Sequence, residues 1–430
     1  MQSGVQQLIN IFVYLSRRGR YSNAMKNSLL ISSACLLALL STVGAALPYP
    51  ILAPLFADGT ANGLNTFLGL PPKLLLGLAL TINPLGLLIG SALLGPMSDR
   101  YGRRPVLLVT AVGAAIGHAI TALALVIESF PLFIVARFIT GLLEGNGSVA
   151  RAMLADKLEG DLRRKALSWL NGAFYMGWLV GPLMAGFTLG YGVTTPFWIA
   201  VALLLGTAVL VAKALPREAP SAATTSWWQV ARHRHALNLL REPELRTLFI
   251  ITLAYSCCVT GFYEFYPLWL VEVPGYGPRG IAWATAAMCG VMTATTIVAG
   301  RKFAGEPLLR ARGFAYATAT LIGVLAVSNA NVGLAAIVLF GIPHAFHSSI
   351  VPHWCAERFG AHGQGAVMGL ISTTFCLANI VMALIGAVLT LIDTRLILLL
   401  SAAFGAWSAW RLQRWHYSLQ HAAPAAGALS

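Results

Sequence analysis

The sequence predicts an all-α integral membrane protein, with twelve transmembrane helices arranged as two pseudo-symmetric halves of six. Of its 430 residues, 57% are hydrophobic and 10% are charged, whereas a soluble globular protein carries about 25% charged residues. Apolar segments recur along the whole chain, and basic residues gather in the gaps between them. A chain with this composition cannot cover itself with polar surface, so lipid must be its main solvent.

Twelve apolar segments are long enough to cross the hydrocarbon core of a bilayer, which takes about 20 residues of helix. Their predicted ranges are 29–56, 74–96, 105–127, 131–154, 166–189, 195–215, 246–272, 280–300, 313–329, 332–352, 364–391 and 394–411. An even number of crossings places both termini on the same side of the membrane.

The basic residues predict the orientation, because cytoplasmic loops carry an excess of Lys and Arg. The gaps on one side contain only Lys73, Arg279 and Arg395. The gaps on the other side contain Arg100, Arg103, Arg104, Lys157, Arg163, Arg164, Lys165, Arg232, Arg234, Arg241, Arg301, Lys302, Arg310, Arg312 and Arg358. We therefore expect this second side, and both termini, to be cytoplasmic. The basic residues do not cluster on a polar domain, which argues against a nucleic-acid partner.

The chain divides into five predicted parts. Residues 29–215 and 246–412 are the two six-helix halves, and the polar stretch 216–245 between them is a cytoplasmic linker. Residues 1–28 form a cytoplasmic N-terminal segment whose helix, at about 5–16, lies on the membrane interface, because its apolar residues share one face. Residues 413–430 form a cytoplasmic tail.

The loop GPMSDRYGRRPVLL, residues 95–108, is the most specific motif. One acid and three arginines cannot lie in hydrocarbon, so this loop joins two helices at the water interface. Its spacing resembles the signature loop of the major facilitator superfamily, and the wider stretch resembles the tetracycline-efflux branch. The resemblance implies two six-helix halves that rock around a midplane site. It also implies gating roles for Gly95, Asp99, Arg100, Gly102, Arg103 and Arg104.

In that family the acid that matches Asp99 faces the N-terminal end of the eleventh helix, near residues 363–365 here. A carboxylate at a positive helix end is favourable by about 0.3–1 kcal/mol. The resemblance therefore implies a clasp between the halves that must break before they part on the cytoplasmic side. The corresponding loop of the second half, residues 300–303, lacks the acid. A loop that only sets the topology is the alternative for Asp99.

Arg137 lies inside the fourth predicted helix, where an arginine in contact with lipid costs at least about 2.5 kcal/mol. At about 100° per residue, Arg137, Gly141, Glu144, Ser148 and Arg151 form one stripe. The R-x-x-x-G pattern resembles the fourth-helix motif of the family, which is linked to proton transfer. We expect Arg137 and Glu144 to take part in proton coupling. A structural arginine bonded to backbone carbonyls is the alternative.

Glu264 is the third candidate for proton coupling. Glu264 and Glu144 are the only acids well inside the predicted spans. Buried carboxyl groups can bind and release protons near neutral pH. The alternative for Glu264 is a carboxylate close to the outer surface, either paired or hydrated.

The fifth predicted helix contains GWLVGPLMAG at residues 177–186. Small residues four apart let helices approach closely, and the proline bends the helix. The pattern, at Gly177, Gly181, Pro182 and Gly186, resembles the motif that marks exporters within the superfamily, although Ala185 replaces one glycine of its final pair. This motif is the main reason to expect export.

A further set of residues is predicted to line a substrate cavity, with aromatic side chains supplying an adaptable apolar wall. The set comprises Gly141, Asn146, Tyr175, Trp178, Tyr263, His344 and His347. For any single aromatic residue, packing or contact with lipid is the alternative. No third ligand lies near the two histidines in sequence, so we expect no metal site.

The resemblance to the tetracycline exporters has limits. Those proteins carry an acid in the first helix, but residues 29–56 contain none, and the functional charges of their eighth and ninth helices have no match in 288–296 or 314–328. The resemblance therefore extends to the fold, but not to tetracycline as the substrate.

Together these features predict a secondary active transporter, without a cofactor, that exports a small amphipathic drug or metabolite in exchange for protons. We expect it to work as a monomer in the bilayer of a bacterial inner membrane. The chain has no P-loop, H-E-x-x-H or G-x-S-x-G pattern, so ATP-driven transport and enzymatic activity are not expected. The alternative is a proton-coupled importer or uniporter for a polar nutrient, such as a sugar or an organic anion held by Arg137 and His344.

Overall fold

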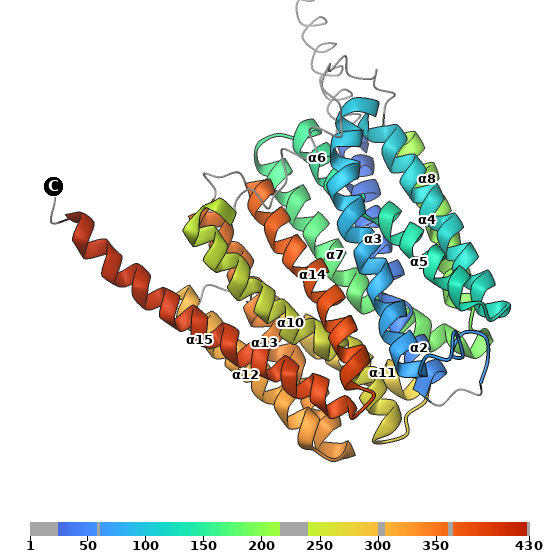
Figure 1. Ribbon diagram of the computed structural model, residues 1–430. Coiled ribbons are helices and arrows are strands. Elements are labelled where there is room, and N and C mark those ends of the chain that lie inside the picture. Colours follow the sequence, from blue (N-terminus) through green and yellow to red (C-terminus); the bar gives the residue numbers. More distant parts are fainter. Residues whose placement is uncertain (1–24, 58–60, 216–239, 300–305, 360–363, 428–430) are drawn as a thin grey trace, which may run out of the picture.

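The computed structural model describes residues 25–57, 61–215, 240–299, 306–359 and 364–427, and the regular elements in these ranges are all helices (Figure 1). The helices run along one another in two bundles, and those before and after residues 216–239 are called the N-terminal and C-terminal halves below. The predicted interfacial helix at 5–16, most of the linker 216–245 and the loop 300–303 lie outside the described residues.

The N-terminal half begins with a broken helix, formed by residues 25–46 and by α2 (Tyr49–Ala57). Its other elements are α3 (Pro72–Tyr101), α4 (Arg103–Val126), α5 (Phe130–Glu144), α6 (Gly147–Lys157), α7 (Gly160–Thr188), the short 3-10 helix Leu189–Tyr191 and α8 (Thr195–Ala214).

The C-terminal half contains α10 (Pro243–Glu272), α11 (Pro278–Ala299), α12 (Pro307–Val327), α13 (Ala330–Arg358), α14 (Gln364–Leu389) and α15 (Thr394–Gly427). The last helix continues beyond residue 411, where the sequence predicted the end of the twelfth span.

Each of the twelve predicted segments coincides with one helix or with a pair of consecutive helices. Within the described residues, nine stretches are long and apolar enough to cross a membrane, and residues 373–389 of α14 form a shorter apolar stretch. The all-helical class is confirmed, whereas the number of twelve crossings stays a prediction.

The break in the first span has a local cause. Pro48 has no amide hydrogen, so the carbonyl oxygen of Gly44 has no donor four residues along the chain. The helix ends at residue 46, and α2 starts at Tyr49. A backbone carbonyl inside the membrane needs another donor, which a neighbouring helix must supply.

The fourth predicted span is also broken. The sequence predicts one helix over 131–154, but α5 ends at Glu144, and α6 begins at Gly147 after a turn at Gly145–Asn146. Asn146 lies at this turn and is buried, with 1% of the residue exposed. The stripe from Arg137 to Arg151 is therefore divided between two helices.

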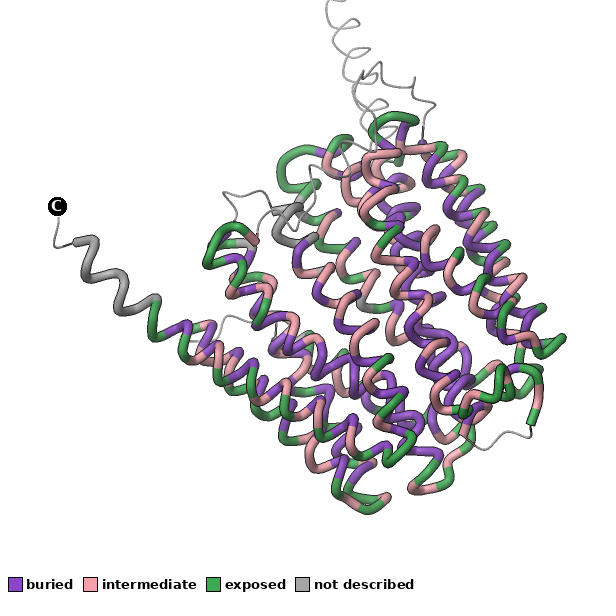
Figure 2. The backbone as a smooth tube through the Cα atoms, in the orientation of Figure 1, coloured by how far each residue is buried: buried purple, intermediate pink, exposed green. Residues whose placement is uncertain are grey.

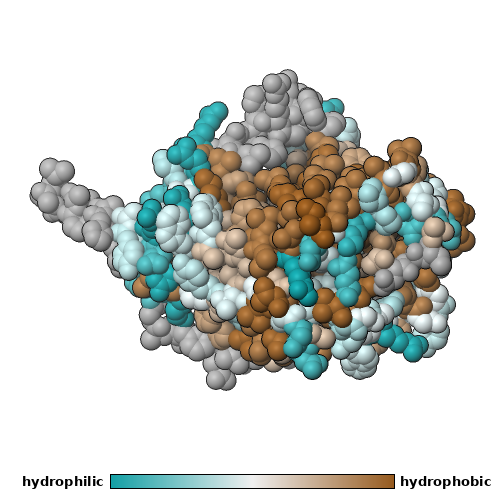
Figure 3. Space-filling view, turned by 60° about the horizontal axis from the view of Figure 1, so that its bottom comes forward, coloured by the Kyte–Doolittle hydropathy of each residue, from teal (hydrophilic) through white to brown (hydrophobic). Residues whose placement is uncertain are grey.

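The outer faces of the bundles carry exposed apolar side chains. On α4, Val109, Ile116 and Leu123 recur every seven residues and are 66%, 55% and 50% exposed. Figure 2 shows buried residues concentrated where helices face one another, and Figure 3 shows broad apolar areas on the surface. Such a surface is unfavourable in water and suits a hydrocarbon solvent.

The two halves meet tightly at the end of the molecule where α3 begins. A Cβ atom placed on Gly77 of α3 would lie within 3 Å of Ala387 and of the Ala383 carbonyl oxygen on α14. One on Gly186 of α7 would touch Ala282 of α11. Glycine is needed at both positions because no other residue leaves room for the opposing helix.

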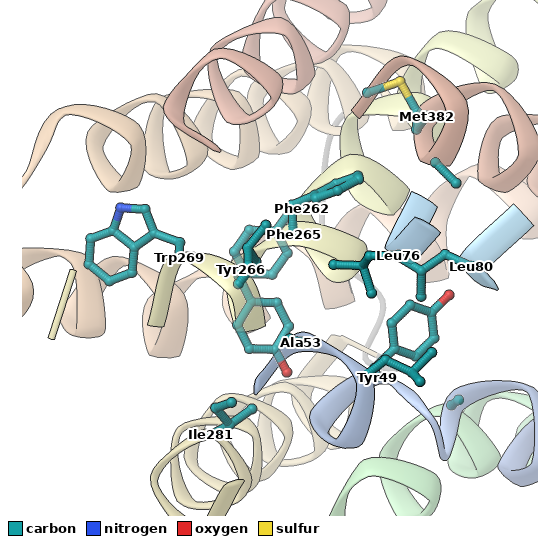
Figure 4. Close-up of a cluster of buried hydrophobic side chains, with 14 of the residues drawn as sticks. Tyr49, Ala53, Leu76, Leu80, Phe262, Phe265, Tyr266, Trp269, Ile281 and Met382 are labelled. Carbon is teal, nitrogen blue, oxygen red and sulfur yellow. The ribbon is translucent and has the colours of Figure 1, made fainter. Parts of the chain in front are cut away.

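A hydrophobic cluster crosses between the halves at the same end. Figure 4 shows Ala53 of α2 and Leu76 of α3 beside Phe265 and Tyr266 of α10, and all four are buried. Towards the opposite end of the molecule, α14 diverges from α3 (Figure 1). The halves are thus packed together at one end and further apart at the other.

Candidate transport site

A narrow cavity of about 20 Å³ lies between the two halves. The N-terminal half contributes Tyr49, Asn83, Arg137 and Trp178 to its lining, and α14 contributes Phe375 and Asn379. The ring of Trp178 lies 6.0 Å from that of Tyr49 and 5.3 Å from that of Phe375, so the aromatic contacts bridge the halves. The space holds about one water molecule. An organic substrate can enter only if the halves move apart.

Arg137 supplies the donors that the broken first span lacks. Its side chain is 2% exposed; Nη1 donates a hydrogen bond of 3.1 Å to the Gly44 carbonyl oxygen, and Nη2 donates one of 3.4 Å to that of Ala45. The guanidinium group thus satisfies the carbonyl freed by Pro48, while its side chain also borders the cavity. Both interpretations of Arg137 from the sequence remain compatible with this position.

Glu144 is fully enclosed, at 1% exposure, and takes part in a polar network of the N-terminal half. Its Oε1 lies 3.0 Å from Nε2 of His118 on α4, and its Oε2 accepts a hydrogen bond of 3.1 Å from Nδ2 of Asn83 on α3. Asn83 Nδ2 also lies 3.3 Å from the carbonyl oxygen of Arg137. Arg137 interacts electrostatically with Glu144 but forms no ion pair with it.

Gly141 and Asn146 have structural contacts rather than a place on the cavity wall. A Cβ atom on Gly141 would lie 2.2 Å from the Asn83 carbonyl oxygen, so this glycine lets α5 press against α3. Asn146 accepts a hydrogen bond of 3.1 Å from Ser41 and donates one of 3.3 Å to Thr110. The turn between α5 and α6 is thereby tied to the first span and to α4.

Glu264 is buried in α10, at 2% exposure. Neither carboxyl oxygen has a hydrogen-bond partner among the described residues. Tyr49, on the cavity wall, is close enough to interact with this carboxyl group electrostatically. Glu264 is thus a buried acid beside the interface of the halves, without a hydrogen-bond partner among the described residues.

Tyr263, His344 and His347 lie within an aromatic cluster of the C-terminal half. Tyr255 of α10 stacks on His347 with ring centroids 3.5 Å apart, and its hydroxyl lies 3.2 Å from Nδ1 of His344. Phe340 stacks on His344 at 5.3 Å, and the Tyr263 ring lies 6.1 Å from His344. The structure brings these residues together but places none of them on the wall of the cavity between the halves. His347 and Tyr255 line a separate space of about 10 Å³ within the C-terminal half.

The exporter-type motif of α7 packs against both halves. A Cβ atom on Gly177 would lie 2.6 Å from the Leu39 carbonyl oxygen, and one on Gly181 would lie 2.9 Å from that of Val43. These two glycines fit α7 against the first span, and Gly186 fits it against α11. Pro182 is buried, whereas the side chain of Tyr175 lies outside the described residues.

The Asp99 loop consists of the last turn of α3 and the first of α4, joined by Gly102 at φ +92°. Asp99 is 55% exposed at its side chain and pairs with Arg103 at 2.5 Å; Arg103 also pairs with Asp156 at 3.0 Å. Arg104 donates to the Ala212 carbonyl oxygen of α8 at 2.8 Å. The bonds just described all lie within the N-terminal half. Residues 360–363, before α14, lie outside the described part of the chain.

The other residues predicted to act in gating lie in or beside the same loop. Arg100 lies with its guanidinium carbon 5.7 Å from the ring centre of Tyr101. A Cβ atom on Gly95 would lie 3.7 Å from the Ser148 hydroxyl, which is an ordinary contact. Gly102 has the stronger requirement, because its positive φ is a conformation that L side chains rarely adopt.

An ion pair joins the halves at the opposite end. Nζ of Lys73, at the start of α3, lies 2.6 Å from Oε1 of Glu272, at the end of α10. The two side chains are 30% and 27% exposed. The pair spans the same interface as the Gly77 and Gly186 contacts.

Sequence reasoning missed Asn83 and His118, which complete the Glu144 network. Each is a polar residue inside an apolar run of a predicted span. Arg137 and Glu264 were selected by the same criterion, a charged residue in an apolar run. The same criterion would have found both. The Lys73–Glu272 pair could not be found in this way, because both residues lie at helix ends, where charges are common.

A family model described as the Major Facilitator Superfamily matches residues 29–383 of this chain. Among curated proteins, the class B tetracycline resistance protein of Escherichia coli is 31% identical over 180 residues. This alignment covers 41% of the chain and 42% of that protein, so the match extends over less than half the length of the relative.

Among solved structures, the human organic anion transporter MFSD10 (TETRAN) is similar with a TM-score of 0.66 at 19% identity, covering 90% of this chain and 99% of that one. A D-xylose-proton symporter is similar with a TM-score of 0.69 at 17% identity, covering 89% and 96%. At such identities the likeness concerns the fold alone.

Proposed function

The chain belongs to the Major Facilitator Superfamily, as its motifs predicted, and we propose that it exports a small amphipathic drug or metabolite in exchange for protons. It is a multi-pass membrane transporter of a small molecule and not an enzyme. The proposal adds the direction of transport, the proton as the driving ion and the class of substrate.

The buried carboxyl group of Glu264 is the observation that carries proton coupling. An ionised carboxylate that is 2% exposed and has no described partner is costly in a low-dielectric interior. Binding a proton removes that cost. When the halves rearrange and water reaches the group, the proton can leave again. An acid with these properties beside the interface of the halves can therefore link proton movement to conformational change.

The direction of transport rests on α7. Gly177 and Gly181 fit this helix against the first span, and Gly186 fits it against α11. These glycines belong to the exporter-type motif, and they make α7 a tight connection between the halves near the cavity. The relative named as a tetracycline resistance protein supports the same direction.

The packing of the halves supports alternating access. The Lys73–Glu272 pair and the Gly77 contact close one end, which the basic residues predict to be the outer one. At the other end, Asp99 is half exposed and pairs within its own half. In our proposal the structure represents a state closed to the outside, and the Asp99 clasp forms when the molecule turns outward. We further propose a monomer in a bacterial inner membrane, with both termini cytoplasmic.

The second candidate is a proton-coupled importer or uniporter of a polar nutrient. The observation in its favour is the polar part of the cavity wall, where Asn83, Arg137 and Asn379 face a small space. The D-xylose-proton symporter shares the fold. Such donors would suit hydroxyl or carboxylate groups of a polar substrate.

The proposal is tested by accumulation of compounds in cells that express the chain, with tetracycline, cationic dyes and secreted metabolites as the panel. We expect reduced accumulation of at least one compound, lost both with a protonophore and with Asp99→Asn. Glu159→Gln, which changes an exposed acid, is the matched control and should retain export. Raised accumulation of a compound would contradict export and support the importer.

A further inference from the structure

The most enclosed pair of ionisable groups in the N-terminal half is formed by His118 and Glu144. Their Nε2 and Oε1 atoms lie 3.0 Å apart, and the two side chains are 0% and 1% exposed. Nδ1 of His118 has no hydrogen-bond partner among the described residues. No contact at Nδ1 therefore fixes the tautomer, and Nε2 acts as donor or as acceptor according to the protonation of Glu144.

The hydrogen bond between these atoms persists in two protonation states. A neutral imidazole donates its Nε2 hydrogen to the carboxylate of Glu144. With one more proton, either the imidazolium donates to the carboxylate or the carboxylic acid donates to the imidazole. The pair can therefore gain or lose a proton without losing its hydrogen bond, which an isolated buried acid cannot do.

The surroundings of the pair come from several elements. Asn83 of α3 donates to Oε2 of Glu144, Phe197 of α8 lies with its ring 6.2 Å from the His118 ring, and Gly44 of the first span packs directly against both groups. Arg137, on the same helix as Glu144, is the charged group that interacts with it. Its positive charge balances the carboxylate when the pair lacks the additional proton.

We propose that His118 and Glu144 together bind the transported proton in the N-terminal half, with His118 as a second proton-binding group beside the acid. This inference rests on the proposed proton-coupled export. Loading forms an N–H bond between the incoming proton and Nδ1 of His118, while one hydrogen stays between Nε2 and Oε1. Release breaks that bond, and the proton returns to water.

The position of the pair links it to the cavity and to the broken first span. Asn83 contacts Glu144 and also lines the cavity, so one side chain separates the pair from the substrate space. A Cβ atom on Gly44 would lie 2.0 Å from Oε1 of Glu144 and 2.5 Å from Nε2 of His118. The Gly44 carbonyl is held by Arg137. A change of charge on the pair therefore acts on the residue next to the break in the first span.

Infrared titration of the purified full chain in nanodiscs tests the proposal without a substrate. The carboxyl band that disappears in Glu144→Gln identifies Glu144. In His118→Gln we expect the pH dependence of this band to move by about one pH unit or more, because strongly coupled groups titrate as a pair. His416→Gln removes a buried histidine from α15 and should leave the band unchanged.

The proposal is overturned if the Glu144 band titrates identically with and without His118, or if no band assigned to Glu144 changes between about pH 5 and 8. If His118→Gln fails to fold, His118→Asn replaces it. Histidine NMR spectra of the parent chain and of Glu144→Gln then show whether a histidine signal changes when the acid is removed. If the Glu144 band does not respond to His118 while the cells still export a compound, this inference alone is contradicted. If the band responds to His118 but the cells export no compound, the proposed function alone is contradicted.

Discussion

Gly44 is the residue where the His118–Glu144 pair, Arg137 and the first span meet. Any side chain at this position would overlap the carboxyl group of Glu144 and the ring of His118. Its carbonyl oxygen, freed by Pro48, is held by Arg137. The absence of a side chain is thus what allows the N-terminal half to enclose its polar network.

Gly44→Ala should therefore disrupt both packing and transport. Overpacking of a buried site costs about 1–3 kcal/mol, and here the displaced atoms are polar groups that would lose their partners. We expect a lower melting temperature in detergent and export reduced to the background of cells without the chain. Gly206→Ala on α8 is the matched control, because a Cβ atom there meets nothing within 4 Å. Equal behaviour of the two variants would contradict this account.

Glu264→Gln separates proton coupling from substrate binding. A glutamine keeps the size of the side chain but cannot release a proton. We expect this variant to retain exchange of substrate across the membrane of proteoliposomes while losing transport against a gradient. Retained uphill transport would exclude Glu264 as a proton carrier, and loss of exchange as well would assign it to substrate binding or folding.

At the scale of the helices, hydropathy was sufficient to predict where the helices of the described residues lie, while the number of twelve crossings stays a prediction. The two breaks could not be predicted in the same way. The interruption at residues 47–48 depends on Pro48 together with donors from Arg137, about 90 residues away in sequence. The turn at Gly145–Asn146 depends on hydrogen bonds to Ser41 and Thr110. Such long-range partners leave no periodic signal in the sequence.

The same limit applies to the candidate site. Arg137, Glu144 and Glu264 stood out because each is charged within an apolar run, and the structure buries all three. The sequence did not reveal that Glu144 faces His118 and that Glu264 has no described partner. Helix rotation decides these contacts, and rotation follows from packing between elements distant in sequence.

The Lys73–Glu272 pair leads to a prediction about α3 and α10. An ion pair exposed to this extent contributes about 0.2–1 kcal/mol, so it biases the equilibrium between open and closed outer ends by at most about fivefold. We expect Lys73→Glu or Glu272→Lys alone to reduce export within that range, and the double reversal to restore it. If the double variant loses as much export as the two single variants together, the pair does not act as a clasp.

At the scale of the whole molecule, the tight contacts described between the two halves lie at one end. Gly77 against α14 and Gly186 against α11 leave no space for side chains there, whereas α3 and α14 diverge towards the other end (Figure 1). The cavity between them is too small for an organic substrate. Transport therefore requires the interface at the closed end to separate.

Spin labels at Leu68 and Ile392 test this movement. The two residues lie in loops of opposite halves, at 80% and 77% exposure, so labels there should not disturb packing. We expect two distance populations, and a larger share of the longer one in Lys73→Glu than in the parent chain. A single distance that is insensitive to this variant and to pH would contradict rocking of the halves.

The most direct test of proton-driven export uses everted membrane vesicles from cells that express the chain. An imposed pH gradient, acidic inside, supplies the proton movement that the account requires, and a compound from the accumulation panel serves as the substrate. The account predicts uptake into the vesicles that stops when the gradient is collapsed and is absent in Glu264→Gln. Uptake that is unchanged after collapse of the gradient, or movement of the compound out of the vesicles, would contradict it.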